Sequence, residues 1–237
     1  MLGWIVAEAV TLIDPGDEVI DAIALVTFSL VVLAVILLVA RQGADRLGPA
    51  TLGIRRTRFW PALGWLVAIG VGVNALTTAY LLLVGAGAES STPAFDAADV
   101  PVAAAVLLVF GVAVLAPIAE EVVFRGYLFA ALSRLRGGPW AAAAVSSVMF
   151  GAAHFLVYPL EILPALAIFG FGACVIFWFT GSLLPCIAVH AFNNAIAMGT
   201  LAGWDWQVPL VVIGAVTLSV LLLLPFARER APQAAKA

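Results

Sequence analysis

Long apolar stretches separated by short polar connections run along almost the whole chain. A helix that crosses a bilayer needs about 20 mainly apolar residues. Seven segments have this character: Val19–Ala40, Phe59–Val84, Pro101 to about Arg134, Trp140–Phe155, Leu160–Thr180, Leu184–Leu201 and Val208–Ala227. The pattern shows no strand-like alternation and no internal repeat. The sequence therefore predicts an all-α fold, a polytopic membrane helix bundle.

Two stretches leave the number of spans between seven and eight. The third segment is too long for one simple crossing and contains Pro117, and a proline kinks a helix or splits it in two. The stretch Leu2–Ile13 is apolar but short, which suits an interfacial segment or an eighth, irregular span. With no soluble domain in the sequence, we expect a single membrane-embedded domain over residues 1–237 and a short tail over 228–237.

The composition agrees with this reading and excludes several classes of protein. Hydrophobic residues make up 64% of the chain and charged residues 11%, against about a quarter charged in ordinary soluble domains. The net charge of −3 and the few basic residues exclude a nucleic-acid binder. Two cysteines, Cys174 and Cys186, are too few for a disulfide scaffold, and we interpret them as packing residues.

Basic residues fall on alternate connections between the predicted spans. Ten of the 11 Lys and Arg residues follow this rule: Arg41, Arg46, Arg55, Arg56, Arg58, Arg134, Arg136, Arg228, Arg230 and Lys236. Such connections stay on the cytoplasmic side of a membrane. We therefore expect a cytoplasmic C-terminus. The Ala- and Arg-rich, Lys-poor composition favours a bacterial plasma membrane.

Few polar groups interrupt the apolar segments, and ionisable groups inside a bilayer usually mark function. The ionisable ones are Glu120, Glu121, Arg125, His154 and His190, which include both histidines of the chain. The intramembrane amides are Asn74, Asn193 and Asn194. Their spacing along the helices decides which of them act together.

The first polar group reads Glu120-Glu121-x-x-x-Arg125. Glu121 and Arg125 lie four residues apart on one helix face, in the favourable order for an ion pair. Glu120 lies about 100° around the helix and has no basic partner at helical spacing. A carboxylate without a fixed ion pair suits general-base work on water. The alternative is that both acids are structural charges paired within the bundle.

The other two groups are Phe150-x-x-x-His154 and His190-x-x-x-Asn194. In a helix each pair projects from one face. An imidazole beside a carboxamide can donate hydrogen bonds to a developing oxyanion. The alternative is a set of hydrogen-bonded contacts between helices, as polar side chains often make in membranes.

The three motifs in this order resemble those of the CAAX protease and bacteriocin-processing family, also called the ABI family, of intramembrane glutamic endopeptidases. The resemblance covers about Val102–Met198 and uses both histidines. It implies hydrolysis of a peptide bond, without a covalent intermediate, in a membrane-associated or lipidated peptide or protein. It also implies that Glu120 and His154 activate water while His190 and Asn194 form the oxyanion hole. Supporting positions are implied for Glu121, Arg125 and Phe150.

Other functions remain open at this stage. One is a non-catalytic membrane binding or bacteriocin-immunity factor that uses the same cavity. A second is a zinc-dependent protease, since a glutamate and two histidines can hold zinc; no His-Glu-x-x-His motif supports it, and we expect no cofactor. A third is a small transporter, although the chain lacks the two related halves that transporters often show.

Overall fold

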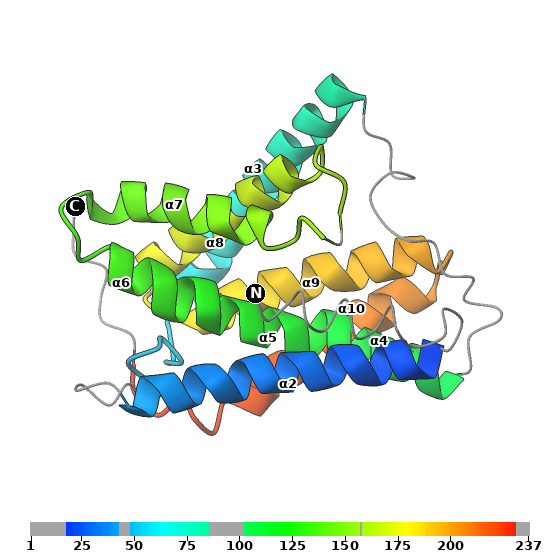
Figure 1. Ribbon diagram of the computed structural model, residues 1–237, viewed down its shortest axis with the longest axis horizontal. Helices are drawn as coiled ribbons and strands as arrows, with labels where there is room; N and C mark the ends of the chain where they lie inside the picture. Colours follow the sequence, from blue (N-terminus) through cyan, green and yellow to red (C-terminus); the bar gives the residue numbers. More distant parts are fainter. Residues whose placement is uncertain (1–17, 43–47, 86–101, 157, 231–237) are drawn as a thin grey trace.

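The computed structural model describes residues 18–42, 48–85, 102–156 and 158–230, and helices dominate all four ranges. Figure 1 shows them running back and forth between two ends of a bundle, with α3 leaning away from the others. No named strand occurs in these ranges; Arg56 and Arg230 form an isolated bridge. The predicted all-α helix bundle is thus confirmed.

The helices lie where the apolar segments predict them. The first two are α2 (Glu18–Gln42) and α3 (Phe59–Val84). A continuous helical run follows, made of α4 (Val102–Phe110), the π-helix η2 (Gly111–Leu115), α5 (Ala116–Glu121), the π-helix η3 (Val122–Phe129) and α6 (Ala130–Leu132). The last four are α7 (Gly138–Ala152), α8 (Leu163–Thr180), α9 (Leu183–Leu201) and α10 (Gln207–Leu223).

Four described stretches are long and apolar enough to cross a membrane: Phe59–Val84, Val102–Leu132, Leu163–Thr180 and Leu183–Thr200. Two shorter apolar helical stretches are Ile23–Val35, within α2, and Gln207–Leu223, which is α10. Helix α7 is also short, with 15 residues. Every one of the seven predicted segments contains a helix. The stretch Leu2–Ile13 and the end of the C-terminal tail lie outside the described residues.

Pro117 does not split the third predicted segment. A proline inside a helix lacks an N–H donor, and its ring clashes with the carbonyl four residues earlier, here that of Ala113. In this protein the π-helix η2 comes directly before α5, and Pro117 lies in the first turn of α5. The wider π-helical turn replaces the usual hydrogen-bond ladder at this point, so the helical run continues through the proline.

The predicted end of the fourth segment is wrong by about one turn. Helix α7 ends at Ala152 rather than at Phe155, so His154 lies in the turn that follows, with its N–H donating to Gly151 O at 3.1 Å. Gly151 packs directly on the start of α8, where an added Cβ would meet Leu163 O at 2.6 Å. The end of α7 and the start of α8 are therefore closely packed. Phe150 and His154 therefore do not share one helix, although they stay in contact.

Two other segment ends also differ, and prolines explain both. Helix α8 begins at Leu163 rather than Leu160, with Pro164 in its first turn, where a proline is tolerated. Helix α10 ends at Leu223 rather than Ala227, shortly before Pro225. A proline close after a helix is common because it cannot continue the helix.

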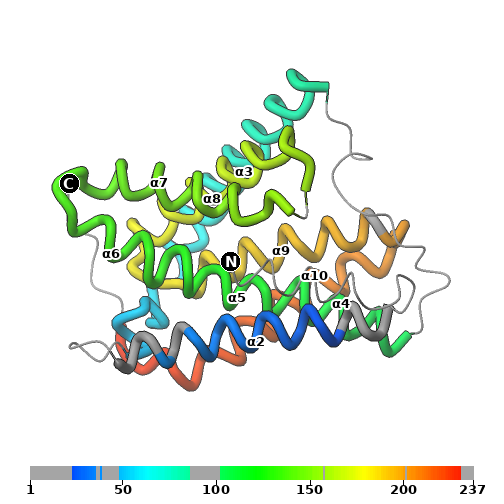
Figure 2. Tube along the Cα trace, in the orientation of Figure 1, coloured from blue at the N-terminus to red at the C-terminus, as the bar shows by residue number. Residues whose placement is uncertain are grey.

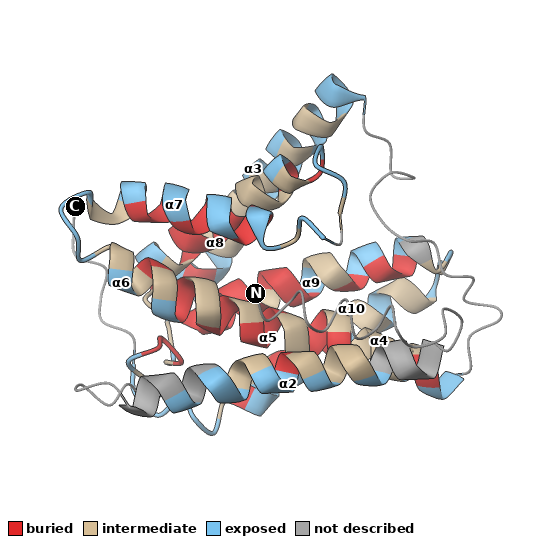
Figure 3. Ribbon diagram, viewed as in Figure 1, coloured by how far each residue is buried: buried red, intermediate tan, exposed pale blue. Residues whose placement is uncertain are grey.

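The bundle buries the facing sides of α5, η3, α7, α8 and α9, while much of α3 is exposed (Figure 3). Helix α7 packs along α8, α9 packs along α10 and η2, and α2 lies against α4. The fully buried side chains include Arg125 and Glu121 as well as Phe150. A buried charge must be paired to be tolerated, so the polar groups of the core need partners.

The segment 48–58 closes one end of the bundle. Leu183 N–H donates to Gly53 O at 2.8 Å, and Ser182 Oγ–H donates to Arg55 O at 2.6 Å. Arg56 N–H donates to Glu229 O at 2.8 Å, so the chain after α10 returns to this same end (Figure 2). The basic connection before α3 and the basic chain after α10 therefore lie at the same end of the bundle.

Candidate active site

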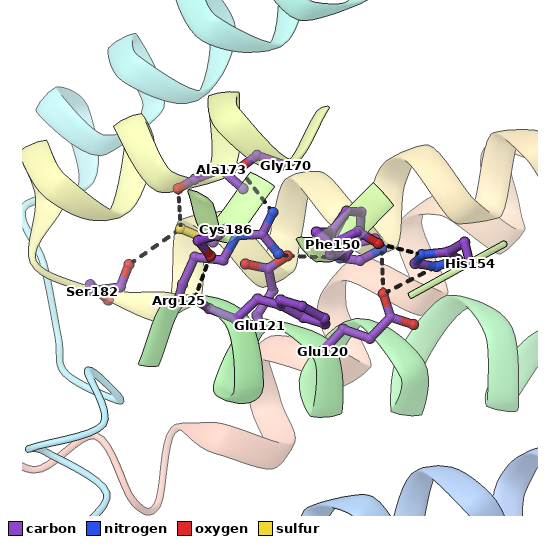
Figure 4. Close-up of polar contacts among 12 residues, drawn as sticks. Glu120, Glu121, Arg125, Phe150, His154, Gly170, Ala173, Ser182 and Cys186 are labelled. Carbon is purple, nitrogen blue, oxygen red and sulfur yellow. Dashed lines mark hydrogen bonds and ion pairs between the residues drawn. The ribbon is translucent and has the colours of Figure 1, made fainter. Parts of the chain in front are cut away.

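Glu120, His154 and His190 come together from three different elements. Glu120 lies in α5, His154 follows α7 and His190 lies in α9. Oε2 of Glu120 is 3.8 Å from Nε2 of His154 and 3.7 Å from Nε2 of His190. Figure 4 shows the Glu120 side chain directed toward His154. This oxygen is buried and has no hydrogen-bond partner among the described residues.

The two adjacent glutamates point in different directions, as helical geometry predicts. They are the last two residues of α5, between the two π-helical segments. The Glu121 side chain is fully buried, whereas that of Glu120 is 27% exposed. Short π-helical segments occur frequently at functional sites. The result is one glutamate in the core and one beside the two histidines.

Glu121 joins Arg125 and His190 in a buried network. Oε1 of Glu121 lies 2.9 Å from Nη1 of Arg125, which is the predicted ion pair. The same oxygen lies 2.8 Å from Nδ1 of His190. Arg125 Nη2–H also donates to Gly170 O at 2.9 Å. Hydrogen bonds of this kind allow a fully buried pair of charges to be tolerated.

The hydrogen bonds assign the tautomers of both histidines. Nδ1 of His154 is 2.8 Å from Phe150 O, and a carbonyl oxygen only accepts, so Nδ1 carries the hydrogen. Oε1 of Glu121, which pairs with Arg125, accepts from Nδ1–H of His190. Both rings consequently turn Nε2 toward Glu120. In the neutral form of each ring this nitrogen is an acceptor.

Phe150 packs beside the site, as the resemblance implies. Its side chain is 1% exposed, and its ring centroid lies 4.9 Å from that of His154 and 5.8 Å from that of His190. The Arg125 guanidinium lies over the same ring, 4.6 Å from its centroid. Such a cation–π contact is attractive and gains strength when water is excluded. Phe150 thus contacts both histidines and the buried arginine.

Asn194 lies one turn beyond His190 on α9. Its Nδ2–H donates to Val112 O in η2 at 2.9 Å, a contact between helices. Among the described residues no hydrogen bond joins Asn194 to Glu120 or to either histidine. One of its two amide hydrogens is thus committed to the backbone, and the other is left for a ligand.

Two neighbours of the site carry no signal in the sequence. Phe169 of α8 stacks edge-on against His190, with ring centroids 5.0 Å apart. Tyr158 lies in the loop after α7, where its N–H donates to His154 O at 3.0 Å. Burial, and after it the charge of Glu120, raises the pKa of the Tyr158 phenol above its ordinary value. An aromatic residue in an apolar helix or a loop tyrosine stands out only once the fold is known.

The described residues contain no group of three His, Cys, Asp or Glu side chains arranged to hold a metal ion. Cys174 and Cys186 are both buried and unbridged, in keeping with their interpretation as packing residues. Sγ of Cys186 lies 3.4 Å from Ala173 O (Figure 4).

A helix bundle with long apolar spans and a cluster of polar side chains in its interior defines the class: an integral membrane protein with a candidate catalytic site. Residues 102–196 match the family model described as type II CAAX prenyl endopeptidase, Rce1-like. This match confirms, for this segment, the resemblance seen in the motifs. The match includes every motif residue from Glu120 to Asn194. Searches of curated proteins and of solved structures found no match.

Proposed function

We propose that this protein is an intramembrane endopeptidase in which Glu120 activates the water that attacks a peptide bond. The substrate is a membrane-associated or lipidated peptide or protein. One observation carries the proposal: a buried, unpartnered carboxylate oxygen faced by Nε2 of both histidines. The family match of residues 102–196 supports protease chemistry in general.

We propose that a water molecule joins Glu120 to the two histidines during the reaction. The two separations from Oε2 to Nε2, 3.7 and 3.8 Å, exceed the range of about 2.7–3.2 Å for a direct hydrogen bond. Polar groups so placed are commonly joined through water. In the proposed step Glu120 takes a proton from this water as its oxygen attacks the carbonyl carbon, and then gives the proton to the leaving nitrogen. His154 Nε2 accepts a hydrogen bond from the other water hydrogen and so fixes the orientation of the water.

His190 and Asn194 are proposed to stabilise the oxyanion. Because Nδ1–H of His190 donates to Glu121, its Nε2 can donate only when the ring is an imidazolium. Glu121 holds the His190 ring in place through Nδ1–H, which gives Glu121 a positioning role. Asn194 contributes the amide hydrogen that Val112 O does not take. Two donors aimed at the developing charge are the usual basis of such sites.

The proposed orientation places the end of the bundle that carries Arg55, Arg56 and Arg230 in the cytoplasm. Connections rich in Lys and Arg stay on the cytoplasmic side of a membrane, which supports this orientation. The contacts of Arg56 with Glu229 and Arg230 also place two of the basic connections at the same end of the bundle. We place the protein in a bacterial plasma membrane on its composition.

The activity is tested by comparing membrane peptides from cells that produce the wild type or Glu120→Gln. Glutamine keeps the shape of the side chain but cannot take a proton from water. We expect cleavage products that depend on the wild type to disappear in Glu120→Gln and to persist in Glu161→Gln, which changes an exposed acid. An unchanged set of products would contradict the proposal and favour a non-catalytic binding or immunity factor.

A chelator tests the metal-independent mechanism. We expect 1,10-phenanthroline to leave the cleavage of a substrate found in the peptide comparison unchanged. Loss of activity, restored by added zinc, would favour the zinc-dependent alternative with Glu120, His154 and His190 as ligands.

A further inference from the structure

A cavity adjoins the candidate active site. It has a volume of about 500 Å³ and lies between α3, α8 and α9. Its lining is largely apolar and includes Leu66, Val73, Ile176 and Phe192 together with two amides, Asn74 and Asn193. These are the two intramembrane amides that the proposed catalytic site does not use.

Both amides have hydrogen-bonding capacity to spare. Asn74 is exposed on α3, and its Nδ2–H donates back to Gly70 O at 2.9 Å, which leaves the carbonyl oxygen and the second amide hydrogen. Within the described part of the chain the Asn193 side chain makes no hydrogen bond. Unpaired polar groups at membrane depth are costly and typically serve a ligand. The cavity therefore carries two donor–acceptor groups without a full set of partners.

A shared wall connects the cavity with the catalytic cluster. Phe169 lines the cavity and packs edge-on against His190, with ring centroids 5.0 Å apart. On α9 the cavity is lined by Val189, Phe192 and Asn193, which are chain neighbours of His190 and Asn194. Phe169 thus borders both the cavity and His190, one of the two proposed oxyanion donors.

We infer that the cavity binds an unwound backbone segment of the peptide substrate, with Asn74 and Asn193 hydrogen-bonded to its amide groups. The inference rests on the proposed endopeptidase function. A peptide bond must leave its helix to be cut, and the freed N–H and C=O groups need partners in the bilayer. A carboxamide supplies both a donor and an acceptor. A hydrocarbon chain would leave both amides unsatisfied, and the volume falls in the range usual for binding pockets.

Photocrosslinking tests this inference in the full chain. The photoreactive residue p-benzoylphenylalanine replaces Phe192 in the Glu120→Gln variant, which leaves a bound substrate intact, and mass spectrometry identifies the covalent adducts. The matched control places the same residue at Leu222 on α10, because the two positions are similarly exposed, at 45% and 42%. A second pair of samples carries Asn74→Leu and Asn193→Leu in addition.

We expect peptide adducts at position 192, with few at position 222. The two asparagine substitutions should reduce recovery of these adducts by about five- to tenfold, the effect of losing two hydrogen bonds of membrane strength. Lipid adducts at position 222 should not change, which shows that the substituted protein is folded and inserted. Adducts to lipid alone, adducts to a second copy of this chain, or peptide adducts indifferent to the asparagine substitutions would overturn the inference.

The outcome separates this inference from the function on which it rests. Peptide adducts that depend on the asparagines, found beside an unchanged cleavage pattern in Glu120→Gln, would leave a peptide-binding protein without the proposed chemistry. Loss of cleavage in Glu120→Gln without such adducts would leave the protease and remove this binding site.

Discussion

His154 and His190 both turn Nε2 toward Glu120, because Nδ1 of each ring donates a hydrogen bond to another acceptor. The acceptors differ: His154 donates to the carbonyl of Phe150, and His190 donates to Glu121. Glu121 is also paired with Arg125, so His190 belongs to the buried network, whereas His154 is held by the backbone alone. In the proposed mechanism His154 accepts a hydrogen bond from water and His190 donates to the oxyanion.

The adjacent amides of α9 offer a test at the scale of single residues. Asn194→Ala removes a proposed oxyanion donor and should lower kcat by about 10²- to 10³-fold, with KM little changed. The fold should persist, since the lost contact with Val112 O is one hydrogen bond between membrane helices, worth about 0.6 kcal/mol. Steady-state kinetics on a cleaved substrate measure both constants.

Asn193→Ala is the matched control for this measurement. Because Asn193 lines the cavity between α3, α8 and α9, its substitution should raise KM and leave kcat near the wild-type value. Equal effects of both variants on kcat would contradict the separate roles given to these two amides.

The polar cluster was predictable because its members are rare. In a chain with 11% charged residues, each ionisable group inside an apolar segment stands out, and helical spacing pairs Glu121 with Arg125. The contacts of Phe169 and Tyr158 were not predictable, because nothing local distinguishes them from other aromatic residues. The bond from Asn194 to Val112 O depends on the packing of α9 against η2, which the sequence pattern does not reveal.

Among the elements, the two π-helical segments and the end of α7 shape the site most. The π-helices flank Glu120 and Glu121, and the early end of α7 turns His154 toward them. Apolar periodicity predicts a helix but does not distinguish its α- and π-helical parts. It also does not place the end of α7, where Gly151 makes a close tertiary contact with α8.

Gly151→Ala tests the importance of that contact. The added Cβ would come within 2.6 Å of Leu163 O, so α7 and α8 must separate, and we expect a loss of about 1–3 kcal/mol in the free energy of unfolding. Gly64→Ala on α3 is the control, since its Cβ meets nothing within 4 Å and should stabilise the helix by about 0.5–1 kcal/mol. Denaturant unfolding in detergent measures both, and equal stability of the two variants would contradict this packing.

For the whole molecule, the alternation of basic connections predicts a direction across the membrane. The chain around Arg56 meets residues 229–230 at one end of the bundle, while Asp205 lies in the turn between α9 and α10. We expect Arg228→Cys to react with a membrane-impermeant maleimide only after the cells are permeabilised, and Asp205→Cys to react in intact cells. Both native cysteines are buried and give a low background. The reverse labelling pattern would contradict the proposed orientation.

The central claim is that Glu120 takes the proton from the attacking water, and the purified protein tests it most directly. The measurement is the single-turnover rate of cleavage of one identified substrate by the wild type, by Glu120→Gln and by Glu161→Gln. We predict that Glu120→Gln binds the substrate but cleaves it at least about 10²- to 10⁴-fold more slowly, the usual contribution of a general base, while Glu161→Gln matches the wild type. Cleavage by Glu120→Gln within a few-fold of the wild-type rate would contradict the account.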